Sequence, residues 1–310
     1  MFPTRQGSFR LFRLFGITVY LHWLWFLIAA YEISNPQQRY SSYLWNALEY
    51  LSLFAIVTMH EFGHALACRS VGGQAEQIVL WPFGGVAYVD PPQRPGAVLW
   101  SLAAGPLVNV VLAPILTVLL VVSRSSGLGG TAPDLYQFII AVWAINLGLL
   151  VFNMLPVYPL DGGQILRALL WFPLGRARSL MVATIIGFVG VAGLICVALW
   201  AQSIWIGAIT VFIMMNCWRG WQQAKALMRL AEMPRRQGFA CPSCRTSPPV
   251  GALWVCGKCR TAFDTFETQG TCPTCSTQFP VTRCLDCGAA NPIGAWALPP
   301  AIPVTPSSGS

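Results

Sequence analysis

Residues 50–68 read YLSLFAIVTMHEFGHALAC, an apolar stretch that contains one polar cluster. Apart from the tyrosine and the cysteine at its two ends, its only ionisable side chains are His60, Glu61 and His64. Such groups are costly at the depth of a bilayer and therefore indicate function. On a helix, His60 and His64 lie on one face, so both imidazoles can reach one zinc ion, with Glu61 beside them. The alternative is a polar helix face satisfied by neighbouring helices.

The composition predicts an integral membrane protein. Hydrophobic residues make up 55% of the chain and charged residues 10%, against about 25% charged residues in soluble domains. Uncharged runs predict an all-α polytopic protein with six transmembrane helices. The expected spans are 14–31, 44–68, 94–124, 134–161 and two helices within 178–219, with a turn near 201–203. A cleavable signal peptide is the alternative for the first run.

The distribution of basic residues orients these spans. With the N-terminus in the cytoplasm, thirteen arginine and lysine side chains fall on cytoplasmic segments, and only Arg39 and Arg124 fall outside. Cytoplasmic loops carry the excess of positive charge. We therefore expect both termini in the cytoplasm, where thiols stay reduced.

Two short β-prone runs, 77–81 and 86–89, flank the sequence PFGG at 82–85. They predict a small membrane-associated β-hairpin. Its edge could hold an extended peptide by strand addition. A surface hairpin without that role is the alternative.

Two histidines leave a catalytic zinc ion one protein ligand short. Asp161 is the only carboxylate between Asp134 and Glu232, and it follows two prolines that interrupt the fourth span. Irregular backbone at membrane depth is tolerated where it lines a protein cavity. Asp161 is therefore the candidate third ligand, and a helix-capping aspartate is the alternative.

Four segments together resemble the site-2 proteases, a family of intramembrane zinc metallopeptidases. They are HEFGH at 60–64, FGGVAYVDPP at 83–92, AAGPLVN at 103–109 and FNMLPVYPLDGGQILRAL at 152–169. The resemblance implies that His60, His64 and Asp161 hold the catalytic zinc and that Glu61 is the catalytic acid/base. It also implies that Asn153 helps to bind the substrate carbonyl.

The same resemblance implies a single-span membrane protein as substrate and a location in the bacterial inner (plasma) membrane. The cut is expected near the cytoplasmic face, because both ligand-bearing segments meet there. His22 matches a histidine often found in the first span of this family. We expect it to be packed and hydrogen-bonded rather than catalytic. Residues 69–96 are too few for a PDZ domain, and nothing in the tail resembles a CBS pair.

The tail contains four CxxC pairs, whose spacing is typical of zinc ribbons. Grouped in chain order, they predict two structural zinc sites in tandem four-cysteine ribbons over 237–290. The first site would consist of Cys241, Cys244, Cys256 and Cys259, and the second of Cys272, Cys275, Cys284 and Cys287. Redox-active pairs are the alternative. Residues 291–310 are expected to be disordered, and the membrane domain to cover 1–236.

The net charge of residues 238–310 is only +1, from four basic and three acidic side chains. This favours a protein partner for the ribbons over nucleic acid. Two functions compete with a zinc endopeptidase. One is a proteolytically inert, membrane-anchored zinc-ribbon adaptor, which would have no use for Glu61. The other is a metal transporter, which would carry ionisable residues along several spans. The substrate's identity does not follow from the sequence.

Overall fold

A computed structural model describes residues 7–34, 40–81 and 84–298. The chain divides into two compact units, Met1–Lys225 and Ala226–Ser310. The first unit combines long helices with one four-stranded sheet, and the second is a small β-rich unit built around cysteines. The fold is therefore mostly helical but not all-α, because the expected hairpin is part of a larger sheet.

The sheet has the strand order β1-β2-β3-β4. Its strands are β1 (Ser8–Leu14), β2 (Ile17–His22), β3 (Gln74–Trp81) and β4 (Gly84–Asp90). β2 pairs with β1 antiparallel and with β3 parallel, and β3 pairs with β4 antiparallel. The strands β3 and β4 confirm the expected pairing, while residues 82–83 between them lie outside the described residues.

The first predicted span is wrong. Residues 14–22 form the end of β1, a tight turn and β2, and the helix that follows, α1 (Leu24–Ser34), has 11 residues. Phe15 and Gly16 both have positive φ, as a two-residue hairpin turn requires. Ile17 and Val19 are fully buried against helix α2, while Thr18 between them is only partly buried. The run is uncharged because alternate residues enter a core, not because it forms a spanning helix.

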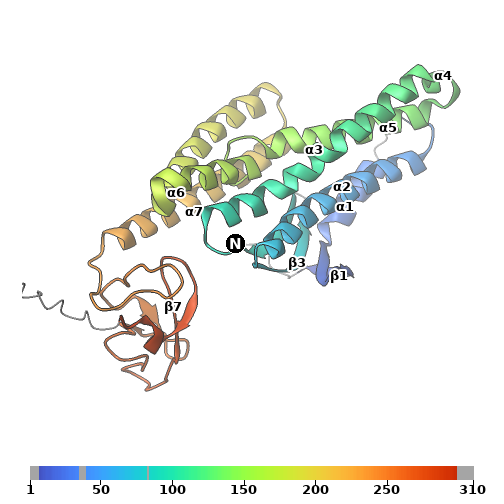
Figure 1. Cartoon of the computed structure of the whole chain (residues 1–310). Helices are drawn as coiled ribbons and strands as arrows, with labels where there is room; N and C mark the ends of the chain where they lie inside the picture. The colour runs from blue at the N-terminus through green and yellow to red at the C-terminus, as the bar shows by residue number, and fades with distance from the viewer. Residues whose placement is uncertain (1–6, 35–39, 82–83, 299–310) are drawn as a thin grey trace, which may run out of the picture. The chain divides into compact units, whose positions relative to one another are not determined.

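The remaining helices of the first unit begin with α2 (Tyr43–Ser70), whose N-terminus is capped by the Ser42 hydroxyl. They continue with α3 (Pro95–Ser125), α4 (Leu128–Thr131), α5 (Pro133–Asn153) and α6 (Asp161–Trp200). Helices α2, α3 and α5 lie side by side (Figure 1), and the sheet packs on α2. α6 is kinked at Gly175, whose φ of 75° and ψ of 170° are not helical.

Four helices of the described chain are long and apolar enough to cross a membrane: α2, α3, α5 and α6. Six spans are therefore not confirmed. The turn expected near 201–203 is present, and after it α7 (Ile204–Glu232) runs into the second unit. α7 carries Asn216 and Arg219 near its middle and is not among the four.

The second unit has two two-stranded sheets and a 3-10 helix. They are β5 (Trp254–Val255) with β6 (Ala262–Phe263), β7 (Val281–Arg283) with β8 (Ala290–Pro292), and η1 (Ile293–Trp296). Residues 291–298 are thus ordered, contrary to the expected disorder from 291 onward. Trp296 is fully buried against Phe266, Cys241 and Cys284, so this segment completes the core of the unit. Residues 299–310 lie outside the described part.

Candidate metal centres

Helix α2 presents the HEFGH motif on its buried face. His60, Glu61 and His64 are all buried, and the two imidazole centroids are 4.8 Å apart. Gly63 and Gly105 allow this packing. A Cβ on Gly105 of α3 would lie 2.2 Å from His64 Nε2, and one on Gly63 would lie 2.6 Å from the Ala104 carbonyl oxygen. The two glycines therefore let α2 and α3 approach closely around the histidines.

Asp161, the first residue of α6, lies beside the two histidines of α2. The loop before it folds back over the first turn of the helix. A Cβ on Gly162 would lie 2.4 Å from the Met154 carbonyl oxygen, and one on Gly163 would lie 2.4 Å from the Tyr158 amide nitrogen. No other residue type fits these contacts. The sequence DGG therefore has a local cause: its two glycines let the loop pack on the helix that carries Asp161.

The three side chains converge. Asp161 Oδ2 lies 3.0 Å from His60 Nε2 and 3.4 Å from His64 Nε2, and the two Nε2 atoms are 3.2 Å apart. Two nitrogen ligands of a tetrahedral zinc ion, each about 2.0–2.1 Å from it, lie about 3.3–3.4 Å apart. The group His60, His64 and Asp161 is thus close to the spacing of a three-ligand zinc site.

Hydrogen bonds on the far side of each ring also fit a metal site. His64 Nδ1 lies 2.8 Å from the carbonyl oxygen of Ser101, which can only accept, so Nδ1 carries the proton. His60 Nδ1 lies 2.7 Å from Asn109 Oδ1. Both Nε2 atoms then keep a lone pair directed at the same point, as a metal site requires. The donor set and its tautomers fit zinc.

The amide of Asn109 is itself held in place by Asn146 of α5. Asn109 Nδ2 donates to Asn146 Oδ1 at 2.9 Å, and Asn146 Nδ2 donates to the Asn109 carbonyl oxygen at 3.1 Å. Both side chains are buried. This pair orients the oxygen of Asn109 toward His60. No role for this pair was predicted from the sequence, although an asparagine inside each of two uncharged spans was a usable signal.

Glu61 faces strand β4 instead of joining the three-ligand group. Its Oε2 accepts a hydrogen bond from the Ala87 N–H at 2.9 Å. A Cβ on Gly85 would lie 2.3–2.5 Å from the side chain of Glu61. β4 is the last strand of the sheet order, so an edge strand lies directly against this carboxylate.

Two further residues singled out in the sequence lie apart from this network. Asn153 is the half-buried last residue of α5, and no hydrogen bond among the described residues joins it to His60, His64 or Asp161. His22 ends β2, where its Nδ1 accepts from the Leu24 N–H at 3.3 Å and its ring lies 4.2 Å from that of Trp81.

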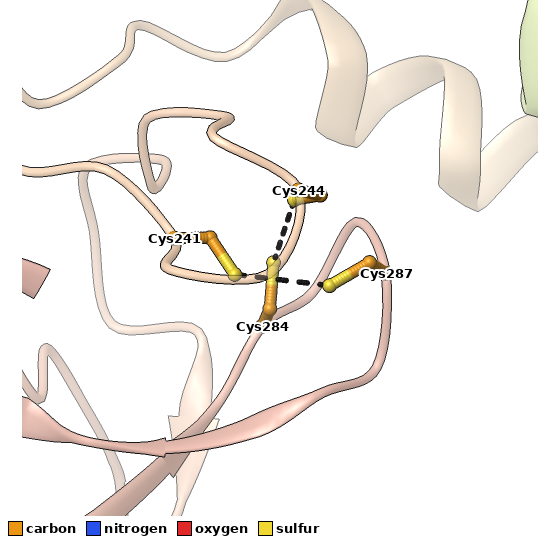
Figure 2. Close-up of side chains that lie close together, drawn as sticks. All are labelled: Cys241, Cys244, Cys284 and Cys287. Atoms are coloured by element: carbon orange, nitrogen blue, oxygen red, sulfur yellow. Dashed lines mark hydrogen bonds between the residues drawn. The ribbon is translucent and has the colours of Figure 1, made fainter. Parts of the chain in front are cut away.

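The tail cysteines form two groups, but not in chain order. One group joins the first and last CxxC pairs: Cys241, Cys244, Cys284 and Cys287 (Figure 2). The other joins the two middle pairs: Cys256, Cys259, Cys272 and Cys275. The predicted division into consecutive quartets is therefore wrong, and the two sites are nested.

The sulfur distances suit tetrahedral zinc. Across the outer site, Sγ atoms paired between the two CxxC segments are 3.8 Å apart, and across the inner site they are 3.6 Å apart. Thiolates about 2.3 Å from a tetrahedral zinc ion lie about 3.8 Å from one another. Hydrogen bonding to the side chain and backbone of Thr261 lowers the pKa of Cys259 to about 6, while burial raises the pKa of its neighbour Cys272 to about 11.

Each CxxC segment forms the same tight turn. The amide of its first cysteine donates to the carbonyl five residues later, and the residue after its second cysteine donates back to the first cysteine's carbonyl. That residue has positive φ in every case: Arg245, Arg260, Ser276 and Gly288. The four turns are thus equivalent local units that can pair in more than one way.

Similarity to known proteins identifies the family to which the first unit belongs. The model of peptidase family M50 matches residues 49–197. Zinc metalloprotease MJ0392 of Methanocaldococcus jannaschii is 34% identical over 180 residues, which are 58% of this chain and 50% of that protein. The YwhC protein of Bacillus subtilis is 30% identical over 199 positions, covering 54% of this chain and 89% of YwhC. The chain therefore belongs to peptidase family M50.

A solved structure is also similar. The site-2 protease from Methanocaldococcus jannaschii is 29% identical, with a TM-score of 0.49, and the match covers 69% of this chain and 95% of that one. The chain spans about half the length of the curated relatives that it matches first. The site-2 protease resemblance seen in the sequence is confirmed, and zinc is the metal that the family indicates.

Proposed function

We propose that the protein is a zinc-dependent intramembrane endopeptidase that hydrolyses a peptide bond of a membrane-spanning substrate near the cytoplasmic face. One observation carries this proposal: His60, His64 and Asp161 converge at zinc-ligand spacing inside long apolar helices, with Glu61 beside them. An adaptor would have no use for a buried glutamate next to such a site, because an unneeded buried carboxylate is costly.

The zinc ligands, Glu61 and Asn153 have separate roles in the proposed hydrolysis. A zinc ion held by this group would supply a Lewis acid that polarises the scissile carbonyl and activates water. Glu61 accepts the proton of the attacking water and later delivers it to the leaving amine. Its Oε2 is fixed by the Ala87 amide, which leaves the other oxygen for this proton. Asn153 is proposed to donate to the carbonyl oxygen of the substrate as negative charge develops there.

Strand β4 gives the substrate a place to bind. A peptide bond inside a helix is shielded, so the substrate must unwind locally before it is cut. Main-chain hydrogen bonds to the edge of a sheet can hold the extended segment. β4 is such an edge, and the amide of Ala87 points from it toward Glu61. Substrate pairing would thus occur beside the catalytic carboxylate.

The proposed orientation keeps both termini in the cytoplasm. The distribution of basic side chains supports this orientation, because cytoplasmic segments carry the excess of positive charge. The ends of α2 and α5 near the metal centre then face the cytoplasm of a bacterial cell, and the plasma membrane is the proposed location.

The ribbon unit is proposed to contact a protein partner or to recruit the substrate. Arg235 and Arg236 pair with Asp286 and Asp264, which leaves a modest net charge on this unit. Such a surface offers little electrostatic attraction to nucleic acid.

Glu61→Gln tests the activity. Membrane proteomes of cells with the wild-type protein and with the variant are compared, and single-span proteins that accumulate uncut are tested with purified enzyme. We expect cleavage to be lost while core zinc stays bound, because Glu61 is not one of the three ligands. Glu49→Gln, which changes another carboxylate of α2, should cleave normally. Cleavage by purified Glu61→Gln at the wild-type rate would favour a different catalytic group, and no cleavage by either protein would favour the inert adaptor.

A further inference from the structure

The sheet carries a polar hollow that the proposed peptidase chemistry does not use. Its volume is about 480 Å³, and it opens between the β1–β2 turn, β3 and the end of α2. The residues that line it are Arg13, Gly16, Thr18, Tyr20, Arg69, Glu76 and Gln77. Two guanidinium groups, two hydroxyl groups and an amide line one space, and such donors suit an anion with several oxygens.

Strand register places these donors together. Arg13 pairs with Thr18 across β1 and β2, and Thr18 pairs with Gln77 across β2 and β3. Side chains of directly paired residues stand on the same face of a sheet. Ile17 and Val19, which flank Thr18, are buried on the opposite face. The polar row therefore lies on the face of the sheet away from α2.

Arg69 indicates where this hollow lies relative to the membrane surface. It lies in the last turn of α2, a candidate membrane span, and its guanidinium donates to the carbonyl oxygens of Phe15 and Gly16 at 2.5 and 3.4 Å. Arginine at the end of a span lies at the boundary between hydrocarbon and water. The β1–β2 turn and the hollow are thus held at the level of lipid headgroups.

The surroundings are apolar where a lipid would extend. Leu11, in the bulge of β1, and Phe15, in the turn that borders the hollow, are 41 and 67% exposed. Such side chains would be unfavourable next to water. In the bilayer they would face acyl chains, while the neighbouring arginine heads remain at the interface.

We propose that the hollow binds the phosphate of an anionic glycerophospholipid. Arg13, which forms no ion pair with another described residue, is its first cationic donor, and Arg69, held by the turn, is its second. Phosphate is the chemistry that this donor set recognises, and a lipid is its source because the hollow lies at the headgroup level beside the exposed side chains of Leu11 and Phe15. Glu76 opposes the anion and limits the affinity. The proposal rests on α2 spanning the membrane and not on peptidase activity.

Native mass spectrometry of the full-length protein with phosphatidylglycerol or phosphatidylcholine tests the site. We expect selective retention of phosphatidylglycerol, and Arg13→Gln should weaken it about fivefold, since a surface cation contributes about 1 kcal/mol to anionic-lipid binding. Arg94→Gln is the matched control, because Arg94 directly precedes α3 and does not line the hollow. Equal effects of the two variants would show diffuse attraction to the membrane and overturn a site.

Two further measurements complete the test. One separates a binding role of these residues from a structural role, and the other separates lipid phosphate from free phosphate. Glu76→Gln removes the opposing charge and should tighten phosphatidylglycerol binding by a similar factor, whereas a purely structural role of these residues would weaken it. Inorganic phosphate alone should not displace the lipid. If it displaces the lipid at equal concentration, the hollow is a site for a free anion and the lipid proposal fails. Unchanged core zinc in each variant shows that the fold is intact.

Discussion

The asparagine pair behind His60 provides the sharpest test of the metal centre. Replacing Asn109 by leucine keeps the number and branching of the side-chain heavy atoms but removes the oxygen that lies 2.7 Å from His60 Nδ1. It also leaves Asn146 without the amide partner that now donates to it. Both groups are buried, so water cannot take over these bonds.

The size of the effect follows from these bonds. A buried donor left without a partner costs about 1–3 kcal/mol, which corresponds to about a 5- to 150-fold change in an equilibrium constant. Groups that orient metal-bound histidines typically change metal affinity by about 10- to 100-fold. Asn109→Leu should therefore weaken zinc binding to the core by about one to two orders of magnitude. Asn109→Asp should lose less, because it keeps an acceptor for His60.

Zinc retained during a chelator titration of the full-length protein measures this affinity. The cysteine sites serve as an internal reference, because they share no ligand with the core. Asn216→Leu is the matched control, since the Asn216 side chain donates to the Phe212 carbonyl oxygen of its own helix and, among the described residues, contacts no metal ligand. If Asn109→Leu holds core zinc as tightly as the wild type, the asparagine pair does not position His60.

Three other changes test separate parts of the structure. Asp161→Ala should lower core zinc occupancy as much as His64→Ala does, and full zinc in the Asp161 variant would place the third ligand elsewhere. Gly85→Ala should reduce cleavage while core zinc is kept, because the added methyl group meets Glu61 at 2.3–2.5 Å; unchanged kinetics would show that β4 moves away freely. Trp296→Ala should cost about 3–5 kcal/mol in the ribbon unit and release the outer zinc before the inner one, as metal analysis of the full-length protein would show. Simultaneous loss of both zinc ions would contradict two separable sites.

The parts of the metal centre that the sequence predicted share a local cause. Four-residue spacing on one helix determines how His60 and His64 face each other, and the two glycines after Asp161 are required by the loop that packs on them. The role of Asn109 depends instead on a contact between three helices, α2, α3 and α5. No single segment of sequence contains that information.

The first span was mispredicted because an absence of charge does not distinguish a spanning helix from buried strands. Both environments exclude charged side chains. The distinguishing signal in residues 17–22 was their alternation, ITVYLH, in which Ile17, Val19 and Leu21 face the core. A hydropathy average over the length of a membrane span covers about five turns of helix and hides a period of two.

Cysteine pairing was mispredicted for a different physical reason. Pairing in chain order would close gaps of eleven and eight residues, whereas the inner site of the nested arrangement closes a gap of twelve. Loop entropy varies only slowly with length, so it does not decide between these arrangements. The four turns are also equivalent in their own hydrogen bonds, so local structure does not decide either.

The aromatic core of the ribbon unit determines which cysteine turns pair into one metal site. Phe266 lies in the chain between the two inner turns, yet it packs with Trp296 and with Cys241 and Cys284 of the outer site. Its ring centroid is 5.1 Å from that of Trp296 and 5.3 Å from that of Trp254, which also contacts the inner cluster. Burying these large rings together brings the first and last cysteine turns to the same side of the core. The ligands of a metal-stabilised fold are thus chosen by its few large apolar side chains, and the segment from Ala290 to Trp296 is as much a part of the ribbon unit as the cysteines are.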